Sequence, residues 1–113
     1  DSAAHCGEMG GFIYVMRAGP FVKIGHSGAP TERVAGVQTG CPLKVELECY
    51  AAGTIRNEQE IHYCLRAAGL RENGEWYRRS KVKRVVRCIQ DNNVALAVIE
   101  AARLFRLRNG YAQ

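Results

Sequence analysis

Two runs rich in β-forming residues, at 12–16 and 21–25, flank a Gly-Pro turn and constrain this chain most strongly. Such runs on either side of a turn predict a β-hairpin. Alternation along the strands places one set of apolar side chains on a shared face: Ile13, Val15, Val22 and Ile24. A loop at residues 17–20 sets Tyr14 opposite Lys23, with their Cβ atoms about 5 Å apart. We therefore expect the hydroxyl of Tyr14 to meet the amine of Lys23.

A first helix and a third strand are predicted after the hairpin. The helix begins at Pro30, because proline favours the first turn of a helix, and it carries Arg33 beside a short apolar stripe. The strand covers residues 43–50, where the apolar and polar residues alternate. The inward side chains of this strand are Leu43, Val45, Leu47 and Cys49.

The second half of the chain is predicted to be helical. Thr54 caps a helix that ends near Ala68 and is closed by Gly69. Ser80 caps a basic amphipathic helix, and an apolar helix covers about residues 94–107. The fold class is therefore α+β, with a small three-stranded antiparallel sheet flanked by helices and an extra helix at the C-terminal end.

The length of 113 residues suits one compact domain. We expect a flexible segment at 1–10, the domain itself at 11–91, and a C-terminal helical segment at 92–113 that packs on or extends it. No apolar run approaches the ~18 residues of a membrane span, and the first ten residues lack signal-peptide features. Five cysteines stand singly, and an odd number without paired spacing predicts a reducing cytoplasm rather than a disulfide framework.

The positive charge is concentrated in one stretch. Lysine and arginine number 16 against 11 acidic residues, and most of the excess lies in residues 71–87. A one-sided basic stretch is typical of a protein that binds a phosphate backbone, while a solvated helix face gives the same pattern. The candidate phosphate-binding residues here are Arg78, Arg79, Lys81, Lys83 and Arg84.

Glu58 and His62 are four residues apart in the helix that follows Thr54, so they share one of its sides. Glu60 points roughly the opposite way, and we expect it to be solvated. Glu58 faces inward, where burial of its carboxylate has to be compensated. One explanation is a functional site, and the other is an ordinary ion pair within the helix.

Four motifs in this order resemble the GIY-YIG nuclease superfamily, in its stand-alone phage and bacterial branch. They are Phe12-Ile-Tyr14 with Lys23-Ile-Gly25, Val37-Gln-Thr-Gly-Cys-Pro42, Glu58-Gln-Glu-Ile-His62, and Gly74-Glu-Trp-Tyr77. The resemblance covers about residues 11–77 and implies a GIY-YIG-like α/β sandwich. The chain departs from the pattern where Phe12 replaces the leading glycine and Lys23 the second tyrosine. The asparagine of the family's later helix has no assigned counterpart.

The resemblance implies a metal-dependent endonuclease, a hydrolase that cleaves phosphodiester bonds in DNA with a single Mg²⁺ or Mn²⁺ ion. Glu58 would then be the metal ligand, since these hard cations prefer carboxylate oxygens. Arg33, eight residues after Gly25, would be the catalytic arginine, whose planar guanidinium matches phosphate oxygens.

The remaining catalytic roles follow from the same resemblance. Tyr14 would help to deprotonate the attacking water, and a cation beside a tyrosine favours its ionised form. We therefore hypothesise that Lys23 tunes Tyr14. His62 would orient water or phosphate, or act as a second base. The position of His26 at the end of the second strand leaves two interpretations open, a contact with phosphate or an ordinary surface role.

Other interpretations stay open at this point. One is a catalytically weak or inactive nucleic-acid-binding module on the same scaffold, and another is a protein-interaction domain that uses its final helix. That amphipathic helix also offers a surface for a homodimer. The alternative role of Tyr14 is packing on its strand alone. Trp76 and Tyr77 either close the core or stack on bases, and their size favours the core.

Overall fold

The computed structural model describes residues 10–110. The strands of this region are β1 (Phe12–Ala18), β2 (Phe21–Ser27), β3 (Glu46–Ala52), β4 (Arg71–Asn73) and β5 (Trp76–Arg78). Its helices are α2 (Pro30–Thr39), α3 (Ile55–Ala67), α4 (Lys83–Gln90) and α5 (Val94–Arg108), with a short 3₁₀ turn, η1 (Arg79–Lys81), before α4. The predicted flexible segment at 1–10 lies outside the described residues except for Gly10.

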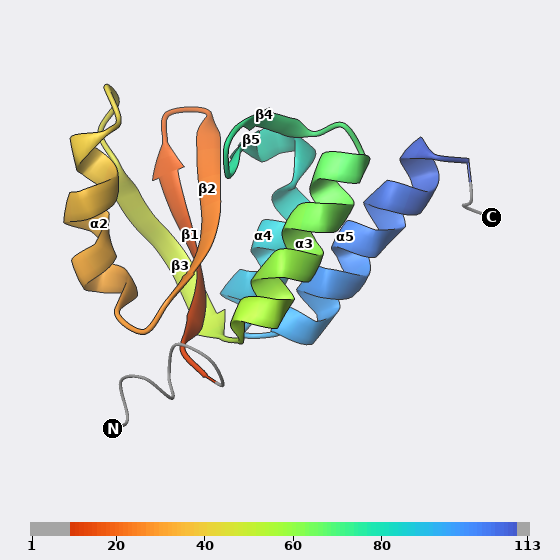
Figure 1. Ribbon diagram of the computed structural model, residues 1–113, viewed down its shortest axis with the longest axis horizontal. Helices are drawn as coiled ribbons and strands as arrows, with labels where there is room; N and C mark the ends of the chain where they lie inside the picture. Colours follow the sequence, from red (N-terminus) through yellow and green to blue (C-terminus); the bar gives the residue numbers. More distant parts are fainter. Residues whose placement is uncertain (1–9, 111–113) are drawn as a thin grey trace.

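The sheet is antiparallel and open, with strand order β3-β1-β2-β5-β4 (Figure 1). The α+β class is confirmed, but the prediction of three strands was wrong, because the described residues form five. The two missed strands have three residues each, too few for alternation to be visible. Gly74 and Glu75 form their turn, with φ of +57° at Gly74, and the Asn73-Gly74 pair is itself a hairpin signal.

Helices cover both faces of the sheet. Helix α2 lies on one face, whereas α3, α4 and α5 lie on the other (Figure 1). The larger core fills the three-helix side and contains the four hairpin side chains predicted for one face, Ile13, Val15, Val22 and Ile24. A smaller core, built from Tyr14, Met16, Ala18 and Val45, packs against α2. The two-face interpretation of the hairpin is therefore confirmed.

The hairpin register differs from the prediction. The strands continue to Ala18 and Phe21, which leaves a two-residue turn with φ of +60° at Gly19. Tyr14 consequently stands opposite Gly25, and Lys23 stands opposite Met16. Tyr14 and Lys23 are diagonal rather than directly opposed, so the expected pairing was wrong. The physical reason is that glycine adopts the left-handed conformation required by a tight turn.

Strand β3 begins later than predicted, at Glu46, and Leu43 is exposed. A bulge opposite Val15 and Met16 interrupts its pairing with β1. Cys49 therefore packs against the larger core while Leu47 packs against the smaller one, although simple alternation places both on one face. A bulge inserts an extra residue and reverses the faces beyond it.

The helix boundaries agree with the sequence where side chains cap them. Pro30 opens α2, and Thr54 caps α3 in a reciprocal pair of hydrogen bonds with Asn57. Gly69 follows α3 with φ of +75°. Ser80 does not cap α4, because it lies inside η1 and α4 starts after Val82 without a side-chain cap.

Helix α5 packs against α3 and α4 and adds Val94, Ala97 and Ala101 to the larger core. Leu96 and Ile99 of the same helix are exposed. Small residues therefore make the contact, and α5 can approach its neighbours closely.

Candidate active site

The site is organised around the second half of β2, where the strand loses its neighbour. Strand β5 pairs with β2 only as far as Lys23, and the backbone N–H of Ile24 donates to the carbonyl of Glu75. Beyond this point, side chains of α3 replace the missing strand. His62 Nε2 lies 2.8 Å from the Ile24 carbonyl oxygen, and the backbone N–H of His26 donates to the Glu58 carboxylate.

Both ring nitrogens of His62 are occupied. A carbonyl can only accept, so Nε2 carries the proton and donates to Ile24. Burial lowers the pKa of His62, although Glu75 and the Ile24 carbonyl oppose this shift. The neutral ring then accepts at Nδ1 from the Tyr77 hydroxyl. Burial raises the pKa of Tyr77 to about 12, and Arg66 donates to its oxygen.

This chain of hydrogen bonds fixes the tautomer of His62 and leaves neither nitrogen available as a base or a metal ligand. In this structure His62 holds the carbonyl of Ile24 and the hydroxyl of Tyr77, and its role as a second base stays a prediction.

Two carboxylates converge beside this histidine. The Oε2 atoms of Glu58 and Glu75 lie 3.8 and 3.9 Å from His62 Nε2. Burial raises the pKa of Glu58, and the neighbouring Glu75 raises it further. Burial alone would raise the pKa of Glu75 too, but the hydrogen bond and charge of Lys23, 2.8 Å away, lower it. The two carboxylates therefore differ in charge compensation: Glu75 has a cation in contact and Glu58 has none among residues 10–110.

The carboxylates suit a hard divalent cation. Three potential ligand atoms lie within 4.8 Å of one another, one each from Glu58, His62 and Glu75. Because the nitrogens of His62 are already bonded, the available donors are the two carboxylates, which are the oxygen ligands that Mg²⁺ and Mn²⁺ prefer. A hollow of about 530 Å³ opens over these residues. Glu58 was expected here, whereas Glu75 was not assigned to a metal from the sequence.

Tyr14 lies directly across Gly25. A Cβ atom added at Gly25 would stand 2.3 Å from the Tyr14 hydroxyl oxygen. Tyr14 is only 1% exposed, and its hydroxyl has no hydrogen-bond partner among residues 10–110.

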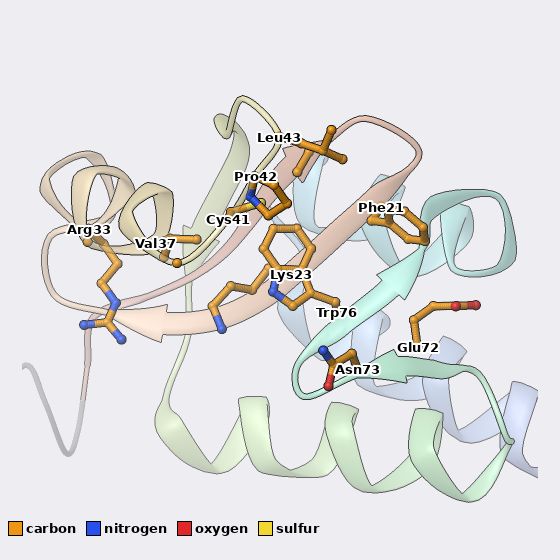
Figure 2. Close-up of a pocket in the computed structure, with 13 residues that line it drawn as sticks. Phe21, Lys23, Arg33, Val37, Cys41, Pro42, Leu43, Glu72, Asn73 and Trp76 are labelled. Carbon is orange, nitrogen blue, oxygen red and sulfur yellow. The ribbon is translucent and has the colours of Figure 1, made fainter.

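Arg33 and Lys23 line a groove of about 670 Å³ between α2 and the β4–β5 hairpin. Figure 2 shows Arg33 reaching down from α2 on one side, with Lys23 and Trp76 in the centre. Arg33 is exposed and makes no ion pair with any of residues 10–110. Lys23 contacts Glu75 and so joins this groove to the hollow over the carboxylates. Tyr14, Glu58 and His62 thus adjoin residues 24–26 of β2, whereas Arg33 lines the neighbouring groove.

The predicted phosphate-binding residues do not form one continuous stripe. Lys81, Lys83 and Arg84 are exposed around the start of α4, on the face of the sheet opposite α2 (Figure 1). Arg78 lies over the ring of Phe21, 4.9 Å from its centroid. Two of the remaining candidates have partners that the sequence did not reveal.

These two are Arg79 and His26. Arg79 is bound to Glu48 through both its Nε and NH2 groups, so its charge is already compensated. His26 Nε2 lies 2.7 Å from the Gly10 carbonyl oxygen. Both residues are thus held by other parts of the chain.

The free cysteines of the described region are Cys41, Cys49, Cys64 and Cys88. Burial, with Glu48 adding to it, raises the pKa of the Cys49 thiol to about 12. Burial also raises the pKa values of Cys64 and Cys88. These three thiols are therefore protonated at neutral pH and are poor nucleophiles.

The fold and site thus define an α+β domain with an open antiparallel sheet and a carboxylate pair at the edge of its second strand. Residues 11–93 match the T5orf172 domain, and the chain belongs to this domain family. Membership is consistent with a nuclease-like or DNA-binding function. No curated protein and no solved structure matches the chain. Of the helices in residues 10–110, none combines the length and hydropathy that crossing a bilayer requires.

Proposed function

We propose that this domain is a GIY-YIG-type endonuclease that hydrolyses phosphodiester bonds in DNA with one bound Mg²⁺ or Mn²⁺ ion. The proposal rests on one observation above all. The side chain of Glu58 is only 14% exposed, beside a second carboxylate and a neutral imidazole, and no lysine or arginine of residues 10–110 pairs with it. A buried carboxylate without a cation is costly, and a bound divalent ion removes that cost.

In this proposal each residue of the site has its own role. Glu58 and Glu75 would hold the ion, which stabilises charge on a phosphodiester when bound. Arg33, free of ion pairs within the described region, would grip phosphate oxygens. The Tyr14 hydroxyl would accept a hydrogen bond from the attacking water and so orient it. Lys23 neutralises Glu75 and faces the groove, so its role is electrostatic.

Cleavage of supercoiled plasmid with Mg²⁺ or Mn²⁺ tests the proposal. We expect Glu58→Gln, which keeps an oxygen for the His26 N–H, to lower the rate at least roughly 100-fold. Glu60→Gln is the matched control, because Glu60 is exposed on the same helix, and it should cut like the wild type. Cleavage by Glu58→Gln at the wild-type rate, or cleavage that persists in EDTA, would refute the proposal.

A second function has a specific observation in its favour. Glu58 and His62 hydrogen-bond to His26 and Ile24 and complete the edge of β2, which gives both residues a structural reason to be where they are. A nucleic-acid-binding domain without catalysis accommodates this arrangement. It predicts salt-dependent DNA binding with no metal-dependent cleavage.

A further inference from the structure

The groove between α2 and the β4–β5 hairpin has two chemically different parts. Arg33 and Lys23 supply positive charge along one part, and an aromatic and apolar wall forms the other. Glu72 also lines the groove, and its Oε2 lies 4.0 Å from Nε of Arg78, which offsets its charge. The wall consists of Phe21, Val37, Pro42, Leu43 and Trp76. Figure 2 shows the indole of Trp76 between Lys23 and Phe21. A ligand that fits this groove has an anionic part and a flat apolar part.

Trp76 is suited to be a fixed platform. It packs against the smaller core beside Tyr14 and Met16, so its position is set by the sheet. It nevertheless remains partly exposed and lines the groove. A base that stacks on an aromatic side chain gains affinity whatever its sequence, because every base has a π face.

The neighbouring polar groups also match a nucleotide. Arg33 has no ion-pair partner in the described region, which leaves its guanidinium available to a phosphate. Asn73 lines the same groove with an amide that both donates and accepts, as the edge of a base requires. The groove volume of about 670 Å³ lies in the range of small-ligand sites.

Duplex DNA does not present such a ligand. In a duplex the flat faces of the bases are covered by their neighbours, and only an unpaired or extruded nucleotide exposes one. The stacking surface in the groove therefore selects for a strand that is locally single.

We propose that this groove binds one unpaired DNA nucleotide, with its base against Trp76 and its phosphate between Arg33 and Lys23. The inference rests on the proposed function and gives it a substrate class: single-stranded DNA, a flap, or an end with an unpaired nucleotide. Because Lys23 contacts Glu75, the bound phosphate lies next to the carboxylate pair.

The fluorescence of Trp76 tests this directly, since it is the single tryptophan of the chain. The wild-type protein is titrated in EDTA with oligothymidylate and, separately, with a duplex of equal length. We expect the single strand to quench the emission and to bind at least tenfold more tightly than the duplex. An unchanged emission at saturation with the single strand, or equal quenching by the duplex, would overturn the inference.

Variants locate the binding site. Trp76→Leu is expected to weaken single-strand binding, measured by anisotropy of a labelled oligonucleotide, by about 5- to 150-fold. Leu43→Glu places a negative charge in the groove at an exposed position and should weaken binding at least about fivefold. Leu96→Glu is the matched control, because Leu96 is 42% exposed on α5 and Leu43 is 43% exposed. Equal losses in the two glutamate variants would place the binding elsewhere.

The two proposals fail in different ways. Metal-dependent cleavage without any response of Trp76 would refute the groove and leave the nuclease. Quenching and tight single-strand binding, with no cleavage by the metal-loaded protein, would refute the nuclease and leave the groove.

Discussion

Gly25→Ala introduces a methyl group where the ring of Tyr14 now lies, and the size of the conflict follows from the structure. The new Cβ would stand 2.3 Å from the hydroxyl oxygen of Tyr14 and 2.4 Å from Cζ. Gly25 does not have a positive φ, so alanine is compatible with the backbone there. The effect of the substitution is therefore one of space alone.

The ring has to move by about 1.1 Å to restore ordinary contact at 3.4 Å. Tyr14 is fully buried in the smaller core, and overpacking of this kind costs about 1–3 kcal/mol. Each kcal/mol lowers Tm by roughly 4–8 °C in a domain of this size. A displacement of about 1 Å in a catalytic group lowers the rate by roughly 100-fold. Gly25→Ala should therefore lose both stability and plasmid cleavage.

Thermal unfolding and plasmid cleavage measure the two effects. Gly36→Ala is the control, since a Cβ there meets nothing within 4 Å; in the middle of α2 it should stabilise by about 0.5–1 kcal/mol. In the double variant Gly25→Ala/Tyr14→Ala, the stability loss should be smaller than the sum of the single losses, because the clash is gone. If Gly25→Ala has the Tm and the cleavage rate of the wild type, the close packing of Tyr14 on Gly25 is important neither for stability nor for cleavage.

Three further predictions concern the charges and protons of the core and site. Glu58→Gln should raise Tm at neutral pH, because the pKa of Glu58 is raised in the fold. The Tm of the variant should exceed that of the wild type by a margin that grows as pH rises from 4.5 through the folded pKa. A Tm difference that is independent of pH would contradict this prediction. Tyr77→Phe leaves Nδ1 of the buried His62 without its donor and should lower the free energy of unfolding in urea by about 1–3 kcal/mol. An unchanged urea midpoint would show that this hydrogen bond does not stabilise the fold. The pKa of Cys49 is raised from its ordinary value of 9.0 to about 12. Its thiol should therefore react with iodoacetamide roughly 1,000-fold more slowly in the native than in the denatured chain, as measured by peptide mapping. Similar rates in the two states would show that this thiol is not buried.

The parts of the fold that the sequence predicted depend on local interactions. The cap at Thr54, the closure at Gly69 and the opening at Pro30 involve only neighbouring residues. The shared side of Glu58 and His62 follows from helical geometry alone. The hairpin faces were predicted for the same reason, since alternation is a property of each strand.

The parts that it did not predict depend on pairing between distant segments. Strand β5 is recognisable only through its partner β2, and its pairing brings Glu75 to Lys23. The Tyr14–Lys23 pair was misplaced because one glycine turn decides the register of the whole hairpin. The place of Glu75 beside the sheet could have been predicted from Asn73-Gly74, because an Asn-Gly pair is typical of a hairpin that returns the chain to the sheet.

The two roles of Glu58 make opposite demands on its charge. To complete the edge of β2, the side chain needs only an oxygen that accepts from the backbone of His26, and a neutral amide provides one. Burial and Glu75 both disfavour the ionised form, so folding alone is better served by a neutral group. A carboxylate at this position therefore opposes stability unless a cation is bound. The proposed catalytic role rests on this conflict, because a bound cation would use the charge of Glu58 and offset the cost of burying it.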